Sequence, residues 1–269
     1  TDMGIAECNM MGYAAGYAAS GAVVFASTFA AFAAGRAYDQ IRNSIAYPNL
    51  NVKIAATHGG VLIGADGGSH QCVEDLALMR AVPNMTILYP ADTIETKKCV
   101  EEAINHKGPV YLRFGRLDSP EIYTEKKDCR ASIGKGTLLR EGQDLTIVAA
   151  GDLVSRALEA AKEMEKNGIC ADVIDMASVK PVDAELLLDS VRKTGCAVTA
   201  EDHNILGGLG GAVSEVLSKN YPVPVEMVGI QDMFGCSGTP KELAEHYGLT
   251  IENIVAAAHR VIRRKEGKS

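Results

Sequence analysis

The sequence contains no tryptophan and only five phenylalanines in 269 residues. No apolar run approaches the roughly 20 residues of a membrane-spanning helix, because charged residues interrupt every candidate. The first residues show no secretory signal pattern. The formal net charge of −7 is moderate and spread along the chain, so we expect no nucleic-acid surface and no membrane partner. The length suffices for two ordinary globular domains.

Seven cysteines are scattered along the chain without a C-x-x-C motif or a histidine pairing at zinc-ligand spacing. Most lie in apolar or helical segments, where cysteine packs as a small hydrophobic residue. Their odd number and irregular spacing favour a reducing cytoplasm over a disulfide framework. We expect no metal site formed by this chain alone.

Strand-like and helix-like segments alternate along the chain. In the first half we expect a helix over 5–21, a strand over 22–27, a helix over 28–47, a strand over 51–58, a helix over 73–81, a strand over 86–90, a helix over 92–107 and a strand over 109–115. The second half repeats the order, with a strand over 144–151, a helix over 154–168, a strand over 171–179, a helix over 183–195, a strand over 196–202, a glycine-rich helix start at 207–217, a strand over 224–230 and two terminal helices. This alternation predicts two consecutive α/β domains, each a mostly parallel sheet flanked by helices.

The alternation lapses between Arg116 and Gln143, in a charged segment that contains proline and glycine. We expect a linker with a short hairpin there, and we place the domains at 1–125 and 126–269. The chain starts at Thr1, without methionine and at the approach to a helix. We therefore expect the N-terminal part of the first domain to precede residue 1.

Glu7 lies in the first turn of the first expected helix, among apolar neighbours. Desolvation there would raise the pKa of its carboxyl, and the neutral acid would then donate a hydrogen bond to a ring nitrogen. The competing interpretation is an ordinary first-turn carboxylate that offsets the helix dipole.

Phe29 and Phe32 are spaced i and i+3, on one face of an expected helix. Two aromatic faces at this spacing are able to sandwich a flat heterocycle. Ordinary core packing is the alternative.

Polar residues gather where the next expected strands end. His58 ends one strand, Asp66 and His70 follow in the glycine-rich loop "GVLIGADGGSHQ", and Arg113 and Arg116 end another strand. Parallel sheets carry their ligands at the carboxyl ends of strands. The two histidines and the aspartate suit acid–base chemistry, contacts to a polyol or phosphate, or, less well, a metal. A guanidinium suits a sugar phosphate.

Several motifs together resemble those of the transketolase family. "GIAECNMMGYAAGYAASG", "ASTFAAF", "GADGGSHQCVEDLALMRAVPNMTILYPAD" and "GPVYLRFGR" are similar to its pyrimidine-binding domain. "AEDHNILGGLGGAVSEVL" is similar to its C-terminal domain. The resemblance covers essentially the whole chain and is closest to the separate C-terminal subunit of transketolases that are split in two.

The resemblance implies that Glu7 binds the aminopyrimidine of thiamine diphosphate and promotes its imino tautomer. Phe29 and Phe32 would stack against the pyrimidine, while the family's third aromatic position holds Gly35.

The resemblance also assigns substrate contacts. His58, Asp66 and His70 would bind the hydroxyl or phosphate groups of sugar-phosphate substrates. His70 would also move protons during carbon–carbon cleavage, and Arg116 would bind a phosphate.

The family's diphosphate- and magnesium-binding signature, GDG followed by an asparagine pair, is not found in this sequence. The resemblance therefore implies an N-terminal partner subunit that holds Mg²⁺ and the diphosphate, in a dimer of heterodimers.

Alternatives remain open at this point. A deoxyxylulose-phosphate synthase shares "RAYDQ", but its spacing from "STF" differs here, so Arg36 receives no role. The beta subunit of a 2-oxo-acid dehydrogenase and a non-catalytic scaffold subunit are the other candidates. The motif "EDHNILGGLGG" suits either a ligand at a helix start or tight packing at a subunit interface.

Overall fold

The computed structural model describes residues 1–124, 129 and 132–267. The elements of the first half are α1 (Glu7–Ala19), β1 (Val24–Phe29), the π-helical segments η1 (Ala31–Arg36) and η2 (Gln40–Ala46), β2 (Val52–Thr57), α2 (Asp75–Ala81), β3 (Thr86–Leu88), α3 (Thr93–Asn105) and β4 (Val110–Arg113). Those of the second half are β5 (Thr137–Arg140), β6 (Leu145–Ala149), α4 (Leu153–Glu165), β7 (Ala171–Asp175), β8 (Ser178–Lys180), α5 (Ala184–Thr194), β9 (Ala197–Asn204), α6 (Leu209–Asn220), β10 (Val225–Ile230), α7 (Pro240–His246) and α8 (Ile251–Lys265).

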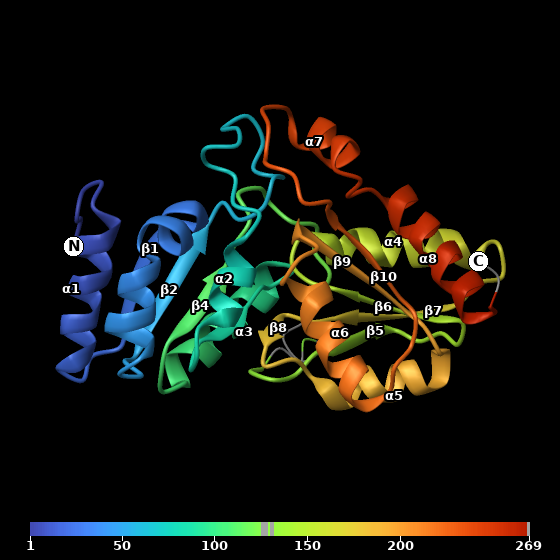
Figure 1. Ribbon diagram of the computed structural model, residues 1–269, viewed down its shortest axis with the longest axis horizontal. Coiled ribbons are helices and arrows are strands. Elements are labelled where there is room, and N and C mark those ends of the chain that lie inside the picture. Colours follow the sequence, from blue (N-terminus) through green and yellow to red (C-terminus); the bar gives the residue numbers. More distant parts are fainter. Residues whose placement is uncertain (125–128, 130–131, 268–269) are drawn as a thin grey trace.

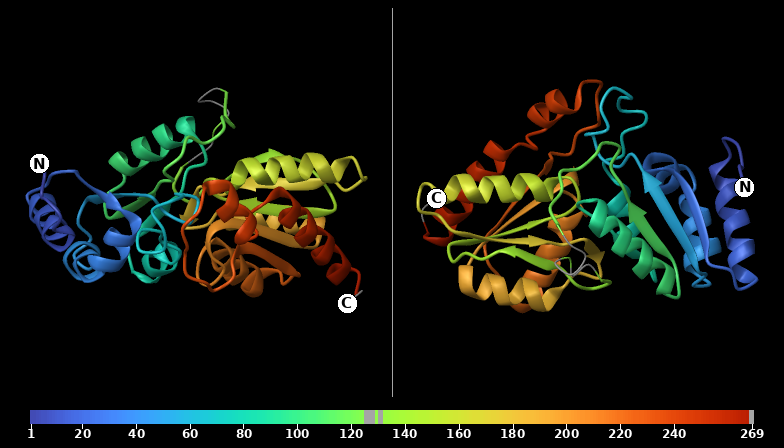
Figure 2. Two further views of the ribbon diagram at one scale, coloured as in Figure 1. Left: turned by 90° about the horizontal axis from the view of Figure 1, so that it is seen from above. Right: turned by 180° about the vertical axis from the view of Figure 1, so that it is seen from behind.

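These strands form two five-stranded sheets that lie side by side (Figure 1). Their orders are β1-β2-β4-β3-β8 and β10-β9-β6-β7-β5. The pairs β3–β8 and β5–β7 are antiparallel, and the other pairs are parallel. In the second sheet, α4 and α8 cover one face and α5 and α6 the other (Figure 2). The predicted α/β class with two consecutive, mostly parallel sheets is confirmed.

The strand expected over 171–179 is in fact two strands that belong to different sheets. β7 pairs with β6, whereas β8 crosses to the first sheet and pairs with β3. Between them the carbonyl of Ala177 accepts a hydrogen bond from the Tyr89 N–H at 2.7 Å. An apolar run cannot reveal this crossing, because both strands are equally buried.

The helix expected over 28–47 is largely π-helical. Its wider turns show in the bonds from the Ala37 N–H to the Phe32 carbonyl and from the Tyr47 N–H to the Arg42 carbonyl, which span five residues instead of four. π-Helical turns are uncommon and frequent at functional sites.

The predicted hairpin in the segment 116–143 is wrong for the part that the structure describes. There an isolated bridge joins Ser132 and Lys135, while β5 pairs antiparallel with β7. The predicted boundary between residues 125 and 126 lies outside the described residues.

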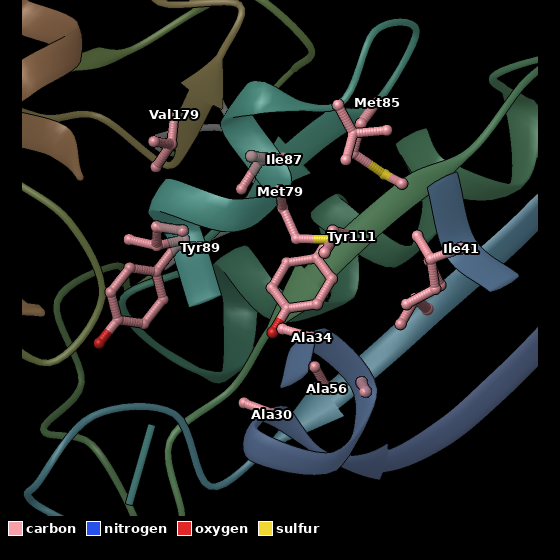
Figure 3. Packing of buried hydrophobic residues seen from close by; sticks show 14 of the residues in the cluster. Ala30, Ala34, Ile41, Ala56, Met79, Met85, Ile87, Tyr89, Tyr111 and Val179 are labelled. Atoms are coloured by element: carbon pink, nitrogen blue, oxygen red, sulfur yellow. The ribbon is translucent and has the colours of Figure 1, made fainter. Parts of the chain in front are cut away.

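One apolar core runs through both halves of the chain. It joins Met11 and Ile41 of the first domain to Val148 and Ile174 of the second sheet. Figure 3 shows part of it, where the aromatic rings of Tyr89 and Tyr111 lie among aliphatic and methionine side chains. The domains therefore share buried surface.

A buried acidic cluster also joins the halves. Asp175, at the end of β7, accepts a hydrogen bond from the Tyr123 hydroxyl at 2.7 Å and is hydrogen-bonded to Glu95 of α3. Burial raises the pKa of Asp175 to about 7 and raises that of Glu95 well above its usual range, and the nearby Asp92 carboxylate acts in the same direction on both. The pair therefore holds a proton in a region without water.

This cluster predicts a stability that falls as the pH rises. The pKa of Asp175 moves from 3.8 to about 7 on folding, so its favourable contribution is complete at acid pH and is lost as the pH rises through about 7. We expect Asp175→Asn, which stays neutral and still accepts from Tyr123, to flatten this slope. Urea unfolding at pH 5 and pH 8 measures it, with the exposed Asp189→Asn as control. Equal slopes for both variants would contradict the shared proton.

Candidate active site

Glu7 opens the site at the start of α1. Its side chain is 7% exposed and forms an ion pair with Arg36, whose Nη1 lies 2.8 Å from Oε2 of Glu7. The Arg36 guanidinium also lies over the ring of Phe32, 4.5 Å from its centroid. Arg36 ends η1, so this π-helical segment brings Glu7 and Phe32 to one place.

The predicted rise in the pKa of Glu7 is wrong. Burial does raise it, but the hydrogen bond and the positive charge of Arg36, together with a backbone hydrogen bond, outweigh that effect and lower the pKa of Glu7 below its usual value. In this arrangement Glu7 is a carboxylate. The correction arises from a residue 29 positions away, which no local pattern around Glu7 indicates.

Four rings continue from Phe32. Phe29 and Phe32 are parallel, within 6°, with centroids 5.9 Å apart. His58 stacks on Phe29 at 3.7 Å, and His70 meets both phenylalanines edge-on, at 6.2 Å and 5.4 Å. The 5.9 Å spacing is below the about 7 Å that a ring needs to insert between two others. A flat group therefore stacks on an outer face of this cluster and does not enter between the phenylalanines.

Beyond the rings lie Asp66 and Arg116. Nη1 of Arg116 is 2.9 Å from Oδ2 of Asp66, and it also donates to the Ile63 carbonyl. Burial lowers the pKa of His58, and the charge of Arg116 acts in the same direction, so His58 is neutral at pH 7. Arg116 also lines a cavity of about 160 Å³ between the two domains, with Ser119 and Arg156 on its walls.

Strand ends explain why these residues meet. β1 ends at Phe29, β2 at Thr57 and β4 at Arg113, and all three strands are parallel. The glycine-rich loop, Gly60–Gln71, leaves from the same edge. Contacts therefore run without a break from Glu7 to Arg116 along the carboxyl edge of the first sheet.

Arg113 does not belong to this surface. It is fully buried and binds Asp75 through two nitrogens, Nε at 2.8 Å and Nη2 at 3.1 Å. The interpretation of Arg113 as a phosphate clamp is wrong for this reason. Arg116, three residues further on, is 43% exposed at its side chain and keeps that prediction open.

Sequence reasoning gave no role to two residues that touch this site. Arg36 was set aside because its spacing differs from that of a related family. Asp202 of β9 was part of the glycine-rich motif "EDHNILGGLGG", and its carboxylate accepts hydrogen bonds from the glycine-rich loop. The RAYDQ and EDH motifs were the available signals.

Comparisons with known proteins match both halves of the chain to family models. Residues 1–121 match the transketolase pyrimidine-binding domain, and residues 134–254 match the transketolase C-terminal domain. The chain belongs to the transketolase family. A Methanocaldococcus jannaschii protein named as a transketolase C-terminal section is 48% identical over 252 residues, which are 93% of this chain and 79% of that protein.

Other transketolase relatives show the same division. A 6-deoxy-6-sulfo-D-fructose transketolase subunit from Clostridium sp. is 44% identical over 98% of this chain and 81% of its own length. A solved split-gene transketolase, described as an inactive beta4 tetramer, has a TM-score of 0.92 and 55% identity, and the match covers 98% of this chain and 84% of that one. The chain is thus a C-terminal subunit of the split type.

Two further observations bound the site. Across the residues that the structure describes, no three His, Cys, Asp or Glu side chains are grouped so as to hold a metal ion. In the same residues, no helix combines the length and the apolar character needed to cross a bilayer.

Proposed function

We propose that this chain is the C-terminal subunit of a thiamine-diphosphate-dependent transketolase. It would transfer a two-carbon ketol unit from a ketose phosphate to an aldose phosphate, together with an N-terminal subunit that holds Mg²⁺ and the diphosphate. The continuous series of contacts from Glu7 to Arg116 supports this most directly, because it combines an acid, stacking rings and anion-binding groups at one sheet edge.

The residues present fit an aminopyrimidine. The Arg36 guanidinium is itself a planar N–H donor that stacks on Phe32 and donates to Glu7. These are the two contacts that an aminopyrimidine would make, so Arg36 occupies its place. When bound, thiamine diphosphate supplies the nucleophilic carbon that accepts the two-carbon unit. Glu7 and Phe32 would orient its pyrimidine ring.

The substrate end follows from the same geometry. Asp66 offers a carboxylate to sugar hydroxyls, and the neutral His58 offers a ring nitrogen. His70 lies edge-on to both phenylalanines, between the stacking rings and Asp66 along the site, where it would move a proton at a substrate hydroxyl. Arg116 would bind the phosphate beside the cavity.

Mixing the chain with its N-terminal subunit, thiamine diphosphate and Mg²⁺ tests the proposal. With xylulose 5-phosphate and ribose 5-phosphate we expect sedoheptulose 7-phosphate. Because relatives are named for 6-deoxy-6-sulfo-D-fructose and apulose 4-phosphate, these donors belong in the same panel. No ketol transfer from any donor would overturn the proposal.

The other candidate functions give different results in the same mixture. Consumption of pyruvate would indicate a deoxyxylulose-phosphate synthase or an oxo-acid dehydrogenase. Absence of cofactor binding by calorimetry would indicate a scaffold subunit.

The position of Arg36 predicts an effect on cofactor affinity. Arg36→Met removes the guanidinium that competes for Glu7 and Phe32, so we expect the assembled enzyme to bind thiamine diphosphate about tenfold more tightly. Isothermal titration calorimetry measures this. Arg42→Met is the control, because Arg42 pairs with Asp39 at 2.8 Å within the neighbouring η2. Weaker binding by Arg36→Met alone would show instead that Arg36 helps to hold the cofactor.

A further inference from the structure

The C-terminal domain meets the glycine-rich loop through one buried carboxylate. Asp202 is 0% exposed, and its two oxygens accept hydrogen bonds from the Val61 N–H, at 2.9 Å and 3.1 Å, and from the Leu62 N–H at 3.0 Å. Charge-assisted bonds of this kind are the strong class of hydrogen bond. They hold the first residues of the loop against a different domain.

The loop is shaped for this contact. Gly60 has φ +83°, and a Cβ there would lie 2.0 Å from Oδ2 of Asp202. The peptide can approach the carboxylate only because the side chain is missing. At the other end of the loop, Nε2 of Gln71 donates to the carbonyls of Gly64 and Cys236, and so ties the loop to the C-terminal domain a second time.

Asp202 is itself held from both domains. Nη2 of Arg113 donates to its carbonyl at 2.9 Å. The residue before it, Glu201, accepts from the Leu209 and Gly210 N–H groups and so caps α6. The carboxylate of Asp202 thus stands on a rigid strand end, between a buried ion pair and a capped helix. Of the two interpretations of this glycine-rich motif, the structure supports tight packing of helix on strand.

We propose that Asp202 is a positioning residue that sets the place of Asp66 and His70 from the C-terminal domain. The inference deepens the proposed function and rests on it for the meaning of the loop. Asp202 touches neither the rings nor Glu7 in the listed contacts of the site, so its effect is confined to the loop. The C-terminal domain would then hold the substrate-binding loop and take no part in cofactor activation.

Hydrogen exchange of the full chain tests the anchor without any activity. In Asp202→Asn one acceptor becomes an N–H donor that faces an N–H, so we expect the amides of Val61 and Leu62 to exchange about tenfold faster or more. The exposed Asp189→Asn is the control for the substitution itself. Unchanged exchange at these amides would overturn the proposal.

Kinetics of the assembled enzyme tests the consequence. We expect Asp202→Asn to raise KM for the ketose donor about tenfold, with kcat and cofactor affinity nearly unchanged. A fall in kcat at constant KM would show a merely structural role and would overturn the positioning role. Wild-type enzyme without ketol transfer would instead remove the proposed function, and the exchange result would then decide alone whether Asp202 holds the loop.

A second variant probes the contact from the loop side. Gly60→Ala places a methyl group against Asp202, and we expect it to reproduce the rise in KM. Gly168→Ala is its matched control, because Gly168 has nearly the same φ, +79°, with nothing within 4 Å of its Cβ position. Equal effects of the two alanines would mean that backbone strain, and not the contact with Asp202, changes the enzyme.

Discussion

Glu7→Gln is expected to lower ketol transfer by the reconstituted enzyme by about 10²–10⁴-fold. Glutamine keeps the size of the side chain and both kinds of hydrogen-bonding group, but it cannot take up or release a proton. The substitution therefore separates proton exchange with a pyrimidine nitrogen from simple binding. The ion pair with Arg36 is lost as well, yet it lies at the molecular surface on the Arg36 side, where exposed pairs stabilise little.

Turnover at saturating thiamine diphosphate measures this effect. Glu215→Gln is the matched control, because Glu215 pairs with Arg80 at the same distance, 2.8 Å, away from the site. We expect the control to retain full activity. If Glu7→Gln kept more than about a tenth of the wild-type rate, Glu7 would not serve as the proton-exchanging group.

The ionised state of Glu7 gives this prediction a further consequence. Arg36 lowers the pKa of Glu7 in the chain as it stands, whereas donation to a ring nitrogen requires the neutral acid. A pyrimidine that replaced the guanidinium would remove the positive charge and leave burial as the main influence on Glu7. The desolvated acid that the apolar neighbours of Glu7 suggested is therefore a property to expect of the loaded site only.

Sequence patterns predicted the part of the site that strand ends determine. Phe29, His58 and Arg116 each follow or end an apolar run, and parallel strands bring such positions to one edge. Periodicity and the ends of apolar runs were sufficient for this step. The same patterns located both sheets.

Long-range partners decided what the patterns could not. Arg113 and Arg116 look alike in sequence, but Arg113 is still within β4 and points to Asp75, while Arg116 lies beyond the strand and reaches Asp66. Likewise the role of Asp202 depends on a loop 141 positions earlier in the chain. Such pairings follow from how the two sheets pack, which local spacing does not contain.

Arg113→Met is expected to lower the free energy of unfolding by about 3–5 kcal/mol. Arg113 and Asp75 are both 0% exposed, so the substitution leaves a buried carboxylate whose charge has lost its partner. The pKa of Asp75 is lowered at present because the charge and hydrogen bonds of Arg113 outweigh the effect of burial, which alone would raise it. The carbonyl of Asp202 also loses its donor, so the junction between the domains weakens together with the first sheet.

Urea unfolding at pH 7 and fixed protein concentration measures this loss. Arg192→Met, in an exposed pair with Asp189 at 3.5 Å, is expected to change stability by less than about 0.5 kcal/mol. The double variant Asp75→Asn with Arg113→Met should cost clearly less than the sum of the two single variants, because the stranded carboxylate is then removed. Additive losses would mean that each side chain stabilises the fold through other neighbours, such as the Tyr111 hydroxyl that donates to Asp75. A loss below about 1 kcal/mol for Arg113→Met would show that water reaches Asp75 and that the junction between the domains is not dry.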